Sequence, residues 1–241
     1  RANDIDKRSI SAFLGDYFPS LLVTDVTKPA AHAGVYKVLL DQFSDFESGK
    51  IVVVTMNLRS FNAQWIYSNL ETALQKSMVL LQPYPPFFNR FLLSFKAYDI
   101  KTDAERTNQF KAQWVKDEFH LPFKFSYRNV ADWDNAYALK GFRDSSGAIN
   151  SKLTELGCHF IKAYGFQIDT ASNPRIRDFN HIVDWAQKHN QILVFNLMPE
   201  NVQLASKLVG DTLVYMIKEN MQLLVDYYKR KGVVVVNNGM V

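Results

Sequence analysis

Four runs of mostly apolar residues, each the length of a strand, are spaced along the chain. They are LLVTDV, IVVVTMN, ILVFNLM and VVVVN, at residues 21–26, 51–57, 192–198 and 233–237. Val, Ile, Leu and Phe occupy both alternating sets of positions in these runs. Strands that are buried on both faces have this composition, as in a parallel sheet covered by helices. We therefore expect four parallel strands.

Helical patterns lie between these runs. Apolar residues recur at spacings of three and four within residues 6–18, 34–43, 174–190 and 211–232. Asn173 and Pro174 form a capping signal at the start of the third helix, and Gly232 closes the fourth. The alternation predicts βαβ units, and hence an α/β fold. We expect a three-layer α/β/α sandwich with a parallel, flavodoxin-like sheet in a single domain over residues 1–241.

An insertion of about residues 82–173 interrupts this alternation. It has no clear buried strand, and it combines aromatic and polar residues with a charged helical stretch at residues 102–119. Its best loop signal is RDSSGA, at residues 143–148. The insertion is either a lid or binding wall or an additional helical layer that only packs, and the sequence favours neither.

Charge and cysteine content limit the classes of partner and ligand. The chain has 28 Lys and Arg against 24 Asp and Glu, a formal net charge of +4, with both signs interspersed. We therefore expect no nucleic-acid partner. No apolar stretch reaches the roughly 18 residues of a membrane span. Cys158 is the only cysteine, which excludes an internal disulfide and a multi-cysteine zinc site, and we expect neither a metal nor a cofactor.

Polar residues follow the expected strands at their carboxyl ends, where open α/β sheets bind ligands. His32 comes after the first run, Asn57 ends the second, Glu200 and Asn201 follow the third, and NNG follows the fourth. These residues either form a site or only solvate turns. The glycine-rich phosphate-binding motifs and G-x-S-x-G are absent from the sequence.

Ser60 would need a histidine base to act as a nucleophile. The two Asp-x-x-His pairs, Asp117 with His120 and Asp178 with His181, do not follow a strand. We therefore expect the Ser60 hydroxyl to cap a helix that begins near Phe61.

The block VVVTMNLRSFNAQW, at residues 52–65, resembles the third conserved block of the SGNH (GDSL-type) hydrolases. Residues 3–14 resemble the segment after the G-D-S nucleophile block in one bacterial branch of that superfamily, and TKPAAHAGVY resembles its second block. YGFQIDTASNPRIRDFNHIVDWAQKHNQILVFNLMPENV resembles its fourth helix and strand region. The resemblance covers most of the chain outside roughly residues 84–140.

The resemblance implies serine-based acyl transfer, with Asn57 donating to the oxyanion hole. His32 or Gly34 would belong to the second oxyanion loop, although Ala30 and Ala31 stand where a glycine is expected. Further residues would contact substrate or brace the loop: Arg59, Asn62, Gln64, Glu200 and Asn201. The nucleophile block would precede Arg1 and the Asp-x-x-His block would follow Val241, so we expect the 241 residues alone to lack esterase activity.

The leading hypothesis is a bacterial serine esterase or O-acyltransferase acting on an acylated small molecule, glycan or cell-envelope polymer. One alternative is a carbohydrate-binding or assembly module of the same fold without catalysis. Another is a nucleotide-sugar enzyme, against which the missing phosphate loop counts. An envelope substrate would favour an extracytoplasmic location.

Overall fold

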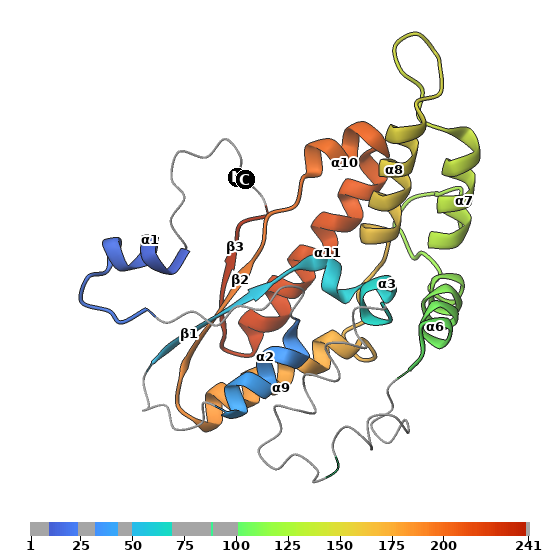
Figure 1. Cartoon of the computed structure of the whole chain (residues 1–241). Coiled ribbons are helices and arrows are strands. Elements are labelled where there is room, and N and C mark those ends of the chain that lie inside the picture. The colour runs from blue at the N-terminus through green and yellow to red at the C-terminus, as the bar shows by residue number, and fades with distance from the viewer. Residues whose placement is uncertain (1–9, 24–31, 43–49, 69–87, 89–100, 240–241) are drawn as a thin grey trace. The chain divides into compact units, whose positions relative to one another are not determined.

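The computed structural model describes residues 10–23, 32–42, 50–68, 88 and 101–239 (Figure 1). The chain divides into two compact units, Arg1–Ala31 and His32–Val241. The first unit contains helix α1 (Ile10–Tyr17), in agreement with the helix expected over residues 6–18. The second unit contains the sheet and the candidate site.

Among the described residues of the second unit, three parallel strands form a sheet: β1 (Ile51–Met56), β2 (Ile192–Leu197) and β3 (Val234–Asn237). Their order is β1-β2-β3. The α/β class and the parallel sheet are thereby confirmed, in an arrangement compatible with a three-layer sandwich. The expected strand at residues 21–26 is wrong for its first half, because residues 21–23 lie in no strand. Residues 24–26 are outside the described ranges.

Helices α2 (Ala33–Gln42), α9 (Pro174–Lys188) and α11 (Asp211–Arg230) begin and end close to the expected residues. Helix α10 (Val202–Leu208) was not expected from the sequence. The Asn173 side chain accepts a hydrogen bond from the Arg175 amide, with Pro174 in the first turn of α9, so this capping signal is confirmed. Gly232 has a positive φ of 79°, as expected after the last turn of α11.

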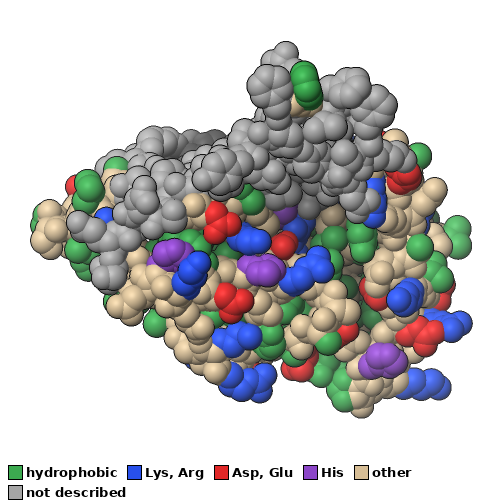
Figure 2. Space-filling view, turned by 90° about the horizontal axis from the view of Figure 1, so that it is seen from below, with side chains coloured by type: hydrophobic (Ala, Val, Ile, Leu, Met, Phe, Trp, Pro, Cys, Tyr) green, Lys and Arg blue, Asp and Glu red, His purple; other side chains and the backbone are tan. Residues whose placement is uncertain are grey.

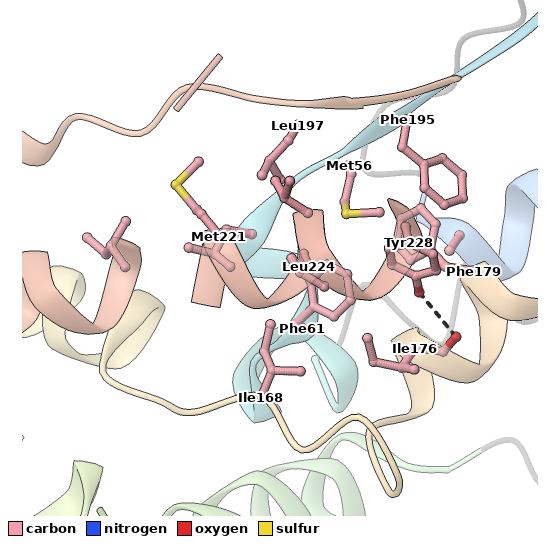
Figure 3. Close-up of a cluster of buried hydrophobic side chains, with 14 of the residues drawn as sticks. Met56, Phe61, Ile168, Ile176, Phe179, Phe195, Leu197, Met221, Leu224 and Tyr228 are labelled. Carbon is pink, nitrogen blue, oxygen red and sulfur yellow. Dashed lines mark hydrogen bonds between the residues drawn. The ribbon is translucent and has the colours of Figure 1, made fainter. Parts of the chain in front are cut away.

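One face of the sheet carries the core (Figure 3). Its strand side chains are fully or almost fully buried: Val54, Met56, Leu193, Phe195 and Leu197. The register pairs Met56 with Leu197, so these side chains lie on the same face. They pack against apolar side chains of α9 and α11 and of the turn after β1. Burying each large apolar side chain contributes roughly 1.5–3 kcal/mol, so this layer is the main source of stability.

The opposite face of the sheet is also apolar, but it is largely exposed. Its strand residues Ile51, Val53, Ile192, Val234 and Val236 are between 43% and 59% exposed. Strands that are aliphatic on both faces are typical of sheets with helices on both sides. The three-layer sandwich that we expect would place a second helical layer on this face.

Within its described residues, the insertion contains helices α6 (Asp103–Lys116), α7 (Val130–Lys140) and α8 (Ser151–Tyr164). The charged stretch expected to be helical at residues 102–119 forms α6, which starts with a capping box between Thr102 and Glu105 and ends at Lys116. RDSSGA forms the expected loop, in which Asp144 accepts hydrogen bonds from the backbone and hydroxyl of Ser146.

Aromatic side chains of the insertion pack against each other. Trp133 is 4% exposed, and Phe119, Phe125 and Tyr127 surround it with ring centroids 4.9–6.2 Å from its own. Trp133 is buried and the other three rings are half-buried, and rings in edge and stacked contacts of this kind stabilise a core. For these aromatic residues, the structure supports the packing interpretation of the insertion over a binding wall.

The charged side chains are mixed over the face shown in Figure 2, where basic and acidic groups lie close together. This agrees with the interspersed charges of the sequence. Among the described helices, none has the length and apolarity needed to cross a membrane.

Candidate active site

The carboxyl ends of the three strands lie side by side. The register places Met56 opposite Leu197, and Leu197 opposite Asn237. The segments that leave the sheet after these residues therefore start at one edge, as expected from the polar residues that follow each run. This edge, with the turn after β1, is the candidate active site.

Asn57 is the first residue after β1, and its side chain has a defined orientation. Its Oδ1 accepts a hydrogen bond of 3.0 Å from the backbone N–H of Arg59, which caps the short 3₁₀-helix η1 (Leu58–Phe61). Within the described residues, the Asn57 Nδ2 group makes no hydrogen bond. The side chain is half-buried. The amide oxygen is thus held by the turn, and the amide nitrogen is left as a donor at the sheet edge.

Ser60 and Asn62 have structural roles in this turn. The Ser60 hydroxyl donates to the Asn57 carbonyl oxygen at 2.7 Å and is buried, so the expectation that it caps a helix near Phe61 is wrong. Asn62 caps helix α3 (Ala63–Ile66) instead, by accepting from the Trp65 amide at 2.8 Å. The Asn62 Nδ2 group donates to the Ala163 carbonyl at 2.7 Å. Asn62 therefore braces the loop from inside the protein and is too buried to contact a substrate.

The N-terminus of α9 holds the same turn from the other side. Asn173 donates to the carbonyl oxygen of Phe61 at 2.8 Å, and the buried Arg175 donates through Nε to that of Ser60 at 3.3 Å. Arg175 also pairs with Asp178 at 2.9 Å. The Asn173 and Arg175 side chains donate hydrogen bonds to backbone carbonyl groups of η1 that accept none within the helix. The turn that carries Asn57 is accordingly fixed on two sides.

Glu200 comes after β2 and lies beside the turn. One carboxylate oxygen accepts a hydrogen bond from the Tyr164 hydroxyl at the end of α8. The other oxygen is buried and, among the described residues, has no hydrogen bond of ordinary geometry. Burial raises the pKa of Glu200, while the Tyr164 hydroxyl, the Arg59 charge and the Leu58 amide act in the opposite direction. Burial also raises the pKa of Tyr164, and the neighbouring Glu200 raises this pKa further. The phenol of Tyr164 therefore keeps its proton.

We predict that the change Glu200→Gln raises stability more at neutral pH than in acid. The folded-state pKa of Glu200 lies above the value of about 4.3 of an unfolded chain. The folded state therefore binds the proton more tightly, and stability is lost as pH rises through the folded-state pKa. Glutamine keeps an acceptor for Tyr164 without this penalty. Melting temperatures measured from pH 4 to pH 8 should show a growing advantage of the variant.

Glu155→Gln is the matched control for this prediction, because Glu155 is exposed on α8. Its melting temperature should follow that of the wild type across the same pH range. An advantage of Glu200→Gln that stays constant or shrinks with rising pH would contradict the assignment of a raised pKa.

His32 and Gly34 do not provide a free oxyanion donor. The Gly34 N–H donates to Nδ1 of the buried His32 at 3.1 Å, at the start of α2. A Cβ atom at Gly34 would lie 2.9 Å from the His32 ring and 3.2 Å from an Asp178 oxygen, which explains why glycine stands here. In this conformation the Gly34 N–H is bonded to His32, and the placement of His32 and Gly34 in an oxyanion or substrate loop stays a prediction. The other residues of that loop, 27–31, are outside the described ranges.

The remaining expected residues lie at the edge without a contact to Asn57. Asn201 caps α10 through the Leu204 amide at 2.9 Å. Gln64 is half-buried on α3. Asn238 after β3 donates to the Asn196 side chain at 2.6 Å, so these two amides satisfy each other. The Asp178 carboxylate serves Arg175, and His181 is exposed, so this pair is not a catalytic dyad.

Sequence reasoning did not identify Tyr164, His159 or Arg175 as neighbours of the edge. All three are about a hundred residues or more from Asn57 in the chain, and no spacing pattern connects them with it. Gly165 is a weak sequence signal that α8 ends after Tyr164. A Cβ atom at this position would lie 2.7 Å from the Ile161 carbonyl oxygen, so glycine fits here. This close approach lets α8 end with Tyr164 at the site.

A hollow of about 300 Å³ lies elsewhere, along α11. Leu121, Gln167 and Ile168 line it together with residues of α11 such as Tyr215 and Glu219. None of its lining residues follows a strand. Within the described ranges, no group of three His, Cys, Asp or Glu side chains is arranged to hold a metal ion.

Comparison with known proteins gives no family for this chain: no family model, no curated protein and no solved structure matches it.

Proposed function

We propose that the protein is a serine esterase or O-acyltransferase of the SGNH type and that Asn57 is a donor of its oxyanion hole. The observation that carries this proposal is the orientation of the Asn57 amide. Its oxygen is held by the Arg59 N–H, and within the described residues its nitrogen has no partner, at the carboxyl edge of a parallel sheet. An amide N–H fixed in advance is the group that an oxyanion hole needs.

The reaction proposed is acyl transfer from an ester. A serine hydroxyl attacks the ester carbonyl and a histidine accepts its proton, so that a covalent acyl-enzyme forms and the alcohol leaves. Negative charge develops on the carbonyl oxygen during the attack, and Asn57 Nδ2 donates to that oxygen. Water or a second alcohol then takes the acyl group. We assign neither the serine nor the histidine to a residue of this sequence.

The acyl acceptor or donor proposed is a glycan or a small polar molecule. The polar residues around the turn after β1 support a hydrophilic substrate, because Arg59 is exposed there and Glu200 and Tyr164 lie beside it. The packed aromatic cluster around Trp133 gives no support to the alternative of a module that binds carbohydrate through those rings.

We predict that the full-length natural protein reacts covalently with a fluorophosphonate probe and hydrolyses p-nitrophenyl acetate. The probe phosphonylates a serine only when that serine is activated, so labelling reports the chemistry and not mere binding. Mass spectrometry of the intact protein should show one phosphonyl group, and heat-denatured protein should show none. A folded protein that neither takes up the probe nor hydrolyses the ester would overturn the proposed function.

A further inference from the structure

Arg59 lies two residues after the proposed oxyanion donor. Its backbone N–H is bonded to Asn57 Oδ1 at 3.0 Å, so the start of its side chain is fixed relative to the Asn57 amide. The side chain is exposed, while its neighbours Leu58 and Ser60 in η1 are buried. The guanidinium group is thus the charge that the turn presents to solvent next to the candidate site.

Three groups of the site are close enough to sense this charge. Arg59 lowers the pKa values of Glu200 and Tyr164, against the larger effect of burial. Burial lowers the pKa of His159, and the charges of Arg59 and Lys162 lower it further. The three affected groups lie on α8 and in the segment after β2, and η1, which carries Arg59, packs against α8.

No described residue pairs with the Arg59 guanidinium. Glu200 is the carboxylate that it influences, but the Tyr164 hydroxyl takes one of its oxygens, and no ion pair joins Glu200 to Arg59. By contrast, Lys162 has Asp134 at 3.8 Å, and Arg175 has Asp178 at 2.9 Å. An exposed arginine is usually a solvated surface charge. Arg59 differs because its position beside the Asn57 amide is where a substrate would lie.

We propose that Arg59 binds an anionic group of the acylated substrate, so that the enzyme prefers esters with a carboxylate or a phosphate near the acyl group. This inference rests on the proposed esterase or acyltransferase function. The planar guanidinium donates two parallel hydrogen bonds to a carboxylate or phosphate, which gives it both affinity and orientation. The anion would be the ion-pair partner for Arg59 that none of the described residues supplies.

Kinetics with matched O-acetyl esters test this substrate preference. The set consists of an acetylated methyl glucoside, the corresponding methyl glucuronate and the corresponding sugar phosphate. Arg59→Gln should lower kcat/KM about ten- to a hundredfold for whichever anionic ester the wild type prefers, since it removes a charged hydrogen bond. It should change kcat/KM for the neutral ester by less than about threefold. Comparison of the two anionic esters shows whether the natural substrate carries a carboxylate or a phosphate.

Arg230→Gln is the matched control, because Arg230 is an exposed arginine in the last turn of α11, which leads to the amino end of β3 and not to the carboxyl edge of the sheet. It should leave all three values of kcat/KM close to those of the wild type. An Arg59→Gln variant that affects neutral and anionic esters equally, or affects neither, would overturn the inference while leaving the proposed function intact.

A binding experiment separates this inference from the proposed function. Methyl phosphate and acetate serve as probes, and the pKa of His159 is followed by NMR. An anion bound to Arg59 offsets the charge that lowers the pKa of His159, so a bound probe should raise it in the wild type and not in Arg59→Gln. If the protein cleaves no ester but this shift is present, the esterase proposal fails and the anion site stands. If neither probe shifts the pKa, the anion site is wrong.

Discussion

Asn57→Ala should lower the turnover number of the enzyme by about a hundredfold to a thousandfold and change KM little. An oxyanion donor bonds a charge that is present mainly in the transition state, so its loss affects kcat more than substrate binding. One such donor contributes roughly 3–4 kcal/mol to the transition state. The measurement is kcat and KM for p-nitrophenyl acetate with the full-length protein.

The Asn57 side chain also caps η1, and this role has to be separated from the catalytic one. Loss of the hydrogen bond from the Arg59 amide to Oδ1 should cost about 1 kcal/mol of stability in the alanine variant. Asn57→Asp keeps an oxygen for the Arg59 amide but removes the N–H donor and adds a negative charge. Its melting temperature should stay close to that of the wild type while its turnover falls at least as far as that of Asn57→Ala. Turnover of Asn57→Asp within a few-fold of the wild type would exclude the oxyanion role.

Phe195→Ala should produce a large loss of stability. Phe195 is fully buried on the middle strand, and its ring centroid lies 5.2 Å from that of Phe179 and 4.8 Å from that of Tyr228. Truncating a buried phenylalanine removes its transfer free energy and leaves a cavity, at a cost of about 3–5 kcal/mol. For a protein of this size, the melting temperature should fall by roughly 6–20 °C.

Leu139→Ala is the control for the core prediction. Leu139 is 87% exposed on α7, and alanine suits a helix. The variant should lose less than about 1 kcal/mol, as exposed substitutions usually do. A similar loss for the two variants, measured by chemical denaturation, would contradict the assignment of the core to the Phe195 face.

Continuous aliphatic runs and capping residues made much of the fold predictable. β1 and β2 begin and end within a residue of the runs expected at 51–57 and 192–198. Asn173 and Pro174 marked the start of α9 correctly, because capping depends on residues adjacent in the chain. Residues 21–23 were wrongly expected to form a strand, since two leucines and a valine fit a strand as well as they fit an irregular segment.

The candidate site was less predictable than the sheet. Asn57 could be placed at the carboxyl edge because it directly follows a strand, and the register confirms that position. The hydrogen bond between Tyr164 and Glu200 joins residues 36 positions apart, and that from Arg175 to the Ser60 carbonyl spans 115 positions. Such contacts depend on how helices pack, which local spacing does not determine. The prediction for Ser60 failed for a local reason. Asn57 caps η1 and Asn62 caps α3, so neither helix start is left for the Ser60 hydroxyl.

A structure of the phosphonylated full-length protein tests the role of Asn57 most directly. After reaction with a fluorophosphonate, the phosphonyl oxygen occupies the place of the oxyanion. We predict that this oxygen lies roughly 2.7–3.1 Å from Asn57 Nδ2, the distance expected for an oxyanion-hole donor. A phosphonyl group bonded to a serine away from this edge of the sheet, with Asn57 Nδ2 facing only solvent, would contradict the account.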